Sequence, residues 1–276
     1  MLFGKGQFEV GRVWGVPICL DISLIVMAVL FIFHSGGHIL IGLLAAVILL
    51  LSVLLHELGH TAVALSYGCR VRDITLLMLG GRATLVDMPR GPWREALMAA
   101  AGPFVSFLLC VGGVMGILGL LGLDSLADFI RGFLGQPVSE QHTAVSPLAY
   151  ALCLYVVKVN RMLLLFNLVP AFPMDGGRIF RALLESRFGR VKATRIAFRV
   201  ARVLAVGMAL WAVFHGFDFI LLLIAYFIFV SSKAEYNMVR AEAKYGGYGG
   251  PGDNSVVISP PPYGRRDEVT DIFRER

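Results

Sequence analysis

The chain has 276 residues, of which 57% are hydrophobic and 16% are charged, and its mean hydropathy is +0.74. Soluble domains carry roughly 25% charged residues, so the charge is too sparse for a polar shell and excludes a soluble enzyme, a nucleic-acid-binding domain and a disordered protein. The net charge of +6 fits the excess of Lys and Arg in the cytoplasmic loops of membrane proteins. The composition therefore predicts a polytopic membrane protein.

Six apolar segments are candidates for membrane-spanning helices, which need roughly 17–25 residues to cross a ~30 Å hydrocarbon core. The second segment is long and becomes polar at its end, and the sixth is short. We therefore expect an all-α membrane protein with six transmembrane helices. The six segments cover residues 16–33, 39–66, 95–121, 146–169, 196–214 and 217–231.

Basic residues alternate between the short loops and predict the orientation of the spans. The loops at 67–94 and 170–195 are rich in Arg, whereas 34–38 and 215–216 hold no Lys or Arg. The loop at 122–145 holds one basic residue, Arg131, beside three acids. This alternation predicts a multi-pass protein of the inner cell membrane with both termini in the cytoplasm.

Two segments outside the spans have a character of their own. Residues 70–88 contain two short β-like runs around Gly80-Gly81, which predicts a small β-hairpin at the cytoplasmic side. From about residue 244 the chain is rich in Gly and Pro without a period, which is typical of a flexible tail. We therefore expect a membrane-embedded domain over 1–235 and a flexible cytoplasmic tail over 236–276.

The second span ends in the sequence Leu-His-Glu-Leu-Gly-His, which contains His56, Glu57 and His60. On a helix, residues four apart lie one turn above each other, so the two imidazoles can bind one Zn²⁺ at ~2.0–2.1 Å each. Glu57 can take a proton from a water that the zinc acidifies, as peptide hydrolysis requires. The alternative is that these three residues lie in the span without a function. That is disfavoured, because inserting an ionisable group at membrane depth costs at least ~2.5–3.5 kcal/mol.

A catalytic zinc usually has three protein ligands, so one more ligand is needed. The spacing of the soluble metzincins is excluded, because Val63 and Ser66 occupy the positions of their glycine and histidine. The next glutamate along the chain is Glu95. Asp175, just beyond the fourth span, is predicted to lie at the same depth as the histidines. It is followed by two glycines, so an ordinary turn carboxylate is the alternative.

Four motifs occur together in the chain: HExxH at 56–60, Gly-Gly at 80–81, Ala-Gly-Pro at 101–103, and Asn167 followed by Pro-Met-Asp-Gly-Gly at 173–177. In this combination the chain resembles the site-2 protease family of intramembrane zinc metalloproteases over about residues 1–235. It looks like a minimal six-helix member, without a PDZ-like insertion or a CBS-type nucleotide-sensing domain. Where the family commonly has an asparagine after its Gly-Pro motif, this chain has Ser106.

The resemblance implies a zinc metalloendopeptidase with one Zn²⁺ per chain. By position, His56, His60 and Asp175 would bind the metal, and Glu57 would be the catalytic base. The family cleaves transmembrane segments of membrane-tethered transcription factors or anti-sigma factors, which is regulated intramembrane proteolysis. The implied partners are therefore a transmembrane protein substrate and the lipid bilayer, with no nucleic acid, and the active site is expected near the cytoplasmic face.

Substrate contacts are also implied by the resemblance. Asn167 would bind substrate or polarise the scissile carbonyl, as an amide donor can. The strand around Gly80 and Gly81 would pair with the backbone of an unwound substrate.

Two other functions are alternatives to a protease. A transporter would predict polar residues in several spans and an internal repeat. An inactive membrane scaffold would have no need of Glu57.

Overall fold

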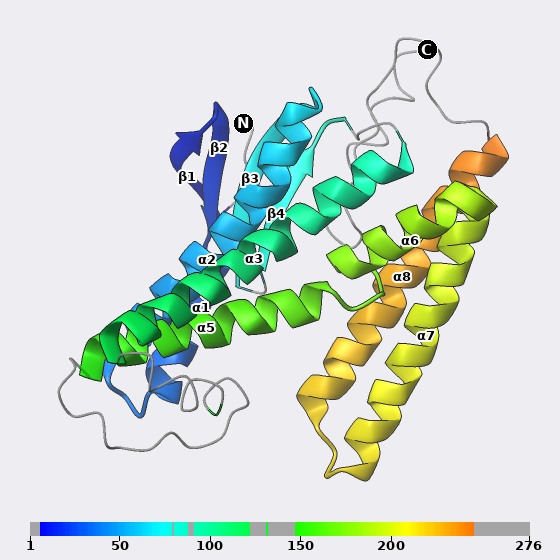
Figure 1. Cartoon of the computed structure of the whole chain (residues 1–276). Coiled ribbons are helices and arrows are strands. Elements are labelled where there is room, and N and C mark those ends of the chain that lie inside the picture. The colour runs from blue at the N-terminus through cyan, green and yellow to red at the C-terminus, as the bar shows by residue number, and fades with distance from the viewer. Residues whose placement is uncertain (1–5, 79, 88–90, 122–130, 132–146, 246–276) are drawn as a thin grey trace. The chain divides into compact units, whose positions relative to one another are not determined.

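The computed structural model describes residues 6–78, 80–87, 91–121, 131 and 147–245 (Figure 1). The predictions made for most of the loop at 122–145 and for the tail beyond Tyr245 lie outside these residues. The chain forms two compact units. The first comprises Met1–Ala83 and Met98–Leu168, and the second Thr84–Leu97 and Val169–Arg276.

A four-stranded sheet forms near the N-terminus, with strand order β1-β2-β3-β4. Strands β1 (Gln7–Val13) and β2 (Val16–Asp21) pair antiparallel across a turn in which Trp14 and Gly15 both have positive φ. Strand β3 (Val71–Leu77) pairs parallel to β2, with Ile18 opposite Ile74. Strand β4 (Gly80–Leu85) lies at the end of the order. The predicted strands around Gly80 are thus present, within a larger sheet than expected.

The sequence-based prediction of one continuous helix over 16–33 is wrong. Its first part is strand β2, and the helix that follows, α1 (Ser23–His34), has 12 residues, or about 18 Å. A continuous apolar run cannot distinguish a buried strand from a helix by its pattern. Here the turn at Gly15 and the burial of Ile18 and Cys19 in the sheet decide for the strand.

The long helices of the first unit are α2 (Ile39–Ser66), α3 (Pro92–Leu121, from Met98 onward) and α5 (Pro147–Asn167). Helix α2 packs against α1, α5 and β3. Asn160 of α5 donates a hydrogen bond to Ser52 of α2 at 3.0 Å, and both side chains are buried. The apolar core of this unit is centred on four buried residues, Val16, Val53, Ile74 and Leu76.

The second unit contains α6 (Asp175–Phe188), α7 (Arg190–Phe214) and α8 (Phe219–Tyr245). Helix α6 lies within a segment, 170–195, that we expected to be a loop. Helix α7 packs against α6 and α8, with a row of buried alanines that allows close approach. Helix α8 runs on past the predicted end of the sixth span, so the boundary expected at residue 235 falls inside a helix. The two-domain division itself stays a prediction.

Five helices of the described chain are long and apolar enough to cross a membrane: α2, α3, α5, α7 and α8. Large apolar side chains on α2 and α7 are exposed, among them Leu40 (71%) and Val203 (70%). Exposed apolar side chains on helices of this length are expected where lipid rather than water surrounds them. The chain is therefore a mostly helical, multi-pass membrane protein with a small sheet.

Candidate metal centre

The two histidines of the HExxH motif lie one turn apart near the C-terminal end of α2, as predicted. Their Nε2 atoms face each other at 3.2 Å, and the ring planes are inclined by 80°. Two nitrogens bound to one tetrahedral Zn²⁺ at ~2.05 Å would lie about 3.3 Å apart. His56 is 4% exposed and His60 is partly buried. The spacing of the two nitrogens therefore fits a shared metal ion.

Helix α3 holds both rings in the orientation that metal binding needs. Nδ1 of His60 donates a hydrogen bond to the carbonyl oxygen of Met98 at 2.8 Å, and Nδ1 of His56 is hydrogen-bonded to Oγ of Ser106 at 3.0 Å. A carbonyl oxygen only accepts, so the proton of His60 is on Nδ1 and its Nε2 carries the lone pair that a metal ion would accept. Hydrogen bonds of this kind fix the tautomer and raise the basicity of metal-binding histidines.

Gly102 leaves the space in front of the two Nε2 atoms open. A Cβ at this position would overlap Nε2 of His60 and lie 2.6 Å from Nε2 of His56. A second glycine, Gly59 on α2, allows the helices to approach closely, because a Cβ there would lie 2.8 Å from the carbonyl oxygen of Ala101. The helices thus meet through glycines at the point where a metal ion would bind.

Strand β4 positions the candidate base. The carboxylate of Glu57 accepts a hydrogen bond from the backbone N–H of Ala83 at 3.2 Å. A Cβ on Gly81 would overlap Cγ of Glu57, so only glycine leaves room for this side chain. Gly80 has φ +139°, a conformation that other residues rarely adopt. The Gly-Gly pair is therefore needed where β4 passes Glu57, whether or not it also contacts a substrate.

The remaining predicted residues lie at helix ends. Asn167 is the last residue of α5, in the first unit, and is partly buried. Asp175 is the first residue of α6, in the second unit, and is also partly buried. A carboxylate in the first turn of a helix is favoured by the helix dipole. Gly177 allows the start of α6 to lie against the backbone of Ala171, since a Cβ there would be 2.6 Å from its carbonyl carbon.

Sequence reasoning missed the histidine partners on α3. Met98, Gly102 and Ser106 are spaced four residues apart, so they form one stripe along the helix. That spacing is visible in the sequence, but nothing local to it indicates which helix the stripe faces. The hydrogen bonds join residues 38 and 50 positions apart.

Comparisons with known proteins agree with this geometry. Residues 44–210, which include the HExxH motif and Asp175, match peptidase family M50. The chain belongs to peptidase family M50. The resemblance to site-2 proteases expected from the sequence is thereby confirmed. The fold also matches the solved site-2 protease from Methanocaldococcus jannaschii, with a TM-score of 0.53, 31% identity and coverage of 83% of this chain and 95% of that one.

Two curated relatives extend the comparison. A zinc metalloprotease of Methanocaldococcus jannaschii is 35% identical over 232 residues, which cover 84% of this chain and 61% of the relative. Stage IV sporulation protein FB of Bacillus subtilis is 28% identical over 171 residues, which cover 62% of this chain and 50% of the relative. The chain thus spans between half and about three fifths of these M50 relatives.

Proposed function

We propose that this M50 chain is a zinc metalloendopeptidase that hydrolyses peptide bonds in or near transmembrane segments of membrane-anchored regulatory proteins. The observation that carries the proposal is the histidine pair on α2. Its two Nε2 atoms face each other at 3.2 Å while both Nδ1 atoms are hydrogen-bonded elsewhere. With the proton of each imidazole on Nδ1, both Nε2 atoms can donate a lone pair to one cation placed between them.

His56 and His60 would hold one Zn²⁺, and we propose Asp175 as the third ligand. Support for Asp175 comes from the ligand number of catalytic zinc sites, from the Asp-Gly-Gly motif, and from its place in the segment that matches family M50. Bound zinc would act as a Lewis acid that acidifies a water and polarises the scissile carbonyl.

Glu57 would take the proton of the attacking water and then deliver it to the leaving amine. Its carboxylate already accepts one hydrogen bond, from Ala83 of β4, which leaves further lone pairs for a water. The same hydrogen bond orients the side chain, so the base is held in place before substrate arrives. This is the preorganisation that general base catalysis benefits from.

A transmembrane helix must unwind before a water can reach one of its carbonyls, because its backbone groups are hydrogen-bonded to one another. We propose that β4, with Gly80 and Gly81, pairs with the unwound segment as an added strand. Its place at the end of the strand order supports this role. Asn167 would donate a hydrogen bond from its amide to the substrate backbone.

For the membrane topology we propose six crossings, made by the five long helices and the shorter α1, with both termini in the cytoplasm and the metal centre near the cytoplasmic face of the inner membrane. The distribution of Lys and Arg between the loops supports this orientation. Substrates of the membrane-tethered transcription factor or anti-sigma factor type remain a proposal drawn from the family resemblance. The M50 match favours the protease over a transporter, and the intact Glu57 favours it over an inactive scaffold.

The decisive experiment combines metal analysis with cleavage of a co-expressed, membrane-tethered regulator. Wild type and Glu57→Gln should each bind one zinc per chain, and only the wild type should cleave. His60→Ala should lose both zinc and cleavage. Glu9→Gln, a carboxylate-to-amide change on β1, serves as the matched control and should cleave like the wild type.

If Glu57→Gln cleaved the regulator as fast as the wild type, Glu57 would not be the catalytic base. Asp175→Asn tests the third ligand separately, because it should lower zinc affinity while leaving the His56–His60 geometry intact. An unchanged zinc affinity in that variant would show that another group completes the site.

A further inference from the structure

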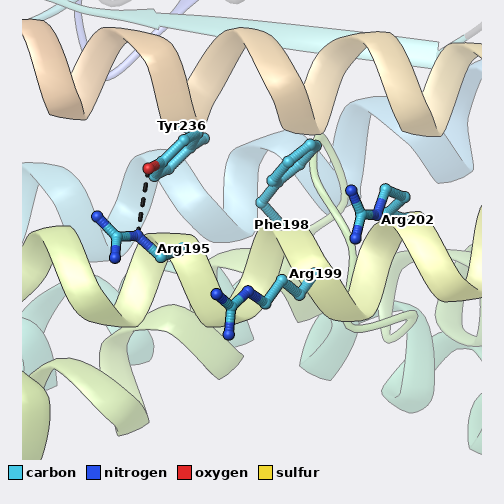
Figure 2. A pocket seen from close by; sticks show the side chains of 5 residues that line it. All are labelled: Arg195, Phe198, Arg199, Arg202 and Tyr236. Atoms are coloured by element: carbon cyan, nitrogen blue, oxygen red, sulfur yellow. Dashed lines mark hydrogen bonds between the residues drawn. The ribbon is translucent and has the colours of Figure 1, made fainter.

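A hollow of about 320 Å³ lies between α7 and α8 within the second unit (Figure 2). This volume is at the small end of the ~300–1,000 Å³ range of ligand pockets. Figure 2 shows side chains from both helices around it, with Tyr236 projecting from α8 and the others from α7. The lining residues are Arg195, Phe198, Arg199, Arg202 and Tyr236.

The hollow has a concentrated positive charge. Its three arginines are spaced at i, i+4 and i+7, so they lie on one face of α7. All three are exposed. Among the residues that the structure describes, no carboxylate lines the hollow, and none of the three arginines forms an ion pair. Three guanidinium groups on one face repel one another unless an anion joins them.

Aromatic rings form a rigid wall beside these charges. Phe198 and Tyr236 are stacked, with ring centroids 5.5 Å apart and planes inclined by 3°. Arg202 lies over the Phe198 ring at 6.0 Å, and Nε of Arg195 donates a hydrogen bond to the hydroxyl oxygen of Tyr236 at 3.2 Å (Figure 2). The hydroxyl accepts in that bond, so its own proton can be donated to a ligand oxygen.

The position along α7 indicates where the ligand comes from. Residues 203–214 carry no charge, and Arg202 and Arg195 lie about 18 Å and 28 Å from Phe214 along the helix. If Phe214 lies at one boundary of a ~30 Å hydrocarbon core, Arg195 lies at the other, with Arg199 and Arg202 about one and two turns further in. Helical side chains lean toward the N-terminus, so these arginines reach back toward the lipid headgroups.

We propose that this hollow binds the phosphate of an anionic lipid headgroup. Guanidinium groups match phosphate oxygens in charge and geometry, and the Tyr236 hydroxyl supplies a further donor. The apolar side of the aromatic wall would lie against the lipid's glycerol and first acyl carbons. Lipid is favoured over free phosphate because two of the arginines lie at a depth where phosphate arrives with the bilayer. The proposal does not depend on zinc or on proteolysis.

The test is a titration of the purified full chain, in neutral detergent micelles, with short-chain phosphatidylglycerol. Binding is followed by native mass spectrometry, and phosphatidylcholine and inorganic phosphate are the comparison ligands. The variant R195Q/R199Q/R202Q should weaken phosphatidylglycerol binding at least about tenfold, since each basic group near a lipid phosphate contributes about fivefold. Y236F, which removes one hydroxyl, should weaken it by a few-fold.

The matched control is R187Q/K192Q/R240Q, which loses the same charge from exposed positions of the same unit that do not line the hollow. It should bind like the wild type. Equal weakening in both triple variants would reduce the effect to general charge attraction and overturn the site. Competition by inorganic phosphate at similar concentrations would assign the hollow to free phosphate instead. If the triple variant does not fold, the single variant R199Q is titrated instead, because Arg199 has no hydrogen bond among the described residues and its loss should not disturb the fold. R199Q should weaken phosphatidylglycerol binding about fivefold, and unchanged binding would overturn the site.

Discussion

The chemistry of the candidate metal centre depends on single atoms that distant residues hold in place. Nδ1 of each histidine is hydrogen-bonded to a group on α3, and the two Nε2 atoms face each other at 3.2 Å. The base is held in the same way, by a backbone N–H of β4. Each of these contacts leads to a prediction about one residue.

Ser106→Ala should weaken zinc binding about tenfold or more, because it removes the hydrogen bond that orients His56. The measurement is a competition titration of zinc against a chelator in detergent. Ser186→Ala is the control, since its hydroxyl only bonds a carbonyl of its own helix. Unchanged zinc affinity in Ser106→Ala would mean that His56 is oriented by packing alone.

Gly81→Ala should lower proteolysis at least about tenfold while leaving zinc content unchanged. The added Cβ would overlap Cγ of Glu57 and displace the base without touching either histidine. Gly112→Ala, where the added carbon meets nothing within 4 Å, is the matched control. A loss of zinc in Gly81→Ala would show that β4 supports the metal centre as a whole.

At the scale of elements, a buried charge cluster ties α6 to its neighbours in the second unit. Arg181 of α6 is 2% exposed and forms ion pairs with Glu95, in the first turn of α3, and with Glu235 of α8 at 2.5 Å. Burial alone would lower the pKa of Arg181, but the two carboxylates more than offset it, so the pKa is raised and the side chain is charged. The cluster therefore fixes the helix that begins at Asp175.

Arg181→Met should lower the free energy of unfolding by about 3–5 kcal/mol, because it leaves the buried carboxylate of Glu95 and the partly buried carboxylate of Glu235 without their partner. Unfolding in mixed micelles with increasing SDS measures this. The neutral triple variant R181M/E95Q/E235Q should recover most of the loss, since no unpaired charge remains. If the triple variant were as unstable as Arg181→Met, the side-chain volume rather than the charge would matter.

At the scale of the whole molecule, the lipid bilayer replaces water as the main solvent of the helices. Helix α2 has 28 residues, or about 42 Å, so its two ends must lie on opposite sides of a ~30 Å core. The proposed orientation places the Ser66 end of α2 in the cytoplasm, because the arginines of the 67–94 loop favour that side.

Single cysteines at the two ends of α2 test this orientation, in a chain whose four native cysteines are replaced. Ser35→Cys should react with a membrane-impermeant maleimide in intact cells, and Ser66→Cys only after lysis. Labelling of cells before and after permeabilisation provides the measurement and its own control. The reverse pattern would invert the topology and place the metal centre near the opposite face.

The sequence by itself determined the local chemistry and the lipid environment. A run of apolar residues specifies a membrane helix through its length, and the four-residue spacing of His56 and His60 specifies a shared face, because both depend only on the geometry of one helix. The apolar run at 16–33 was wrongly predicted to be a helix for the same reason. Its first part is strand β2, and only its pairing with strands elsewhere in the chain distinguishes it from a helix.

Only the tertiary structure decided what surrounds these residues. The contacts of Met98 and Ser106 with the histidines, the room that Gly81 leaves for Glu57, and the arginine hollow between α7 and α8 each join segments that are separate in the sequence. Helix α6 was missed because a polar segment that starts with Asp-Gly-Gly has the local pattern of a loop. Its helical state is stabilised by packing on α7 and by the buried partners of Arg181, and these are not visible in the local sequence.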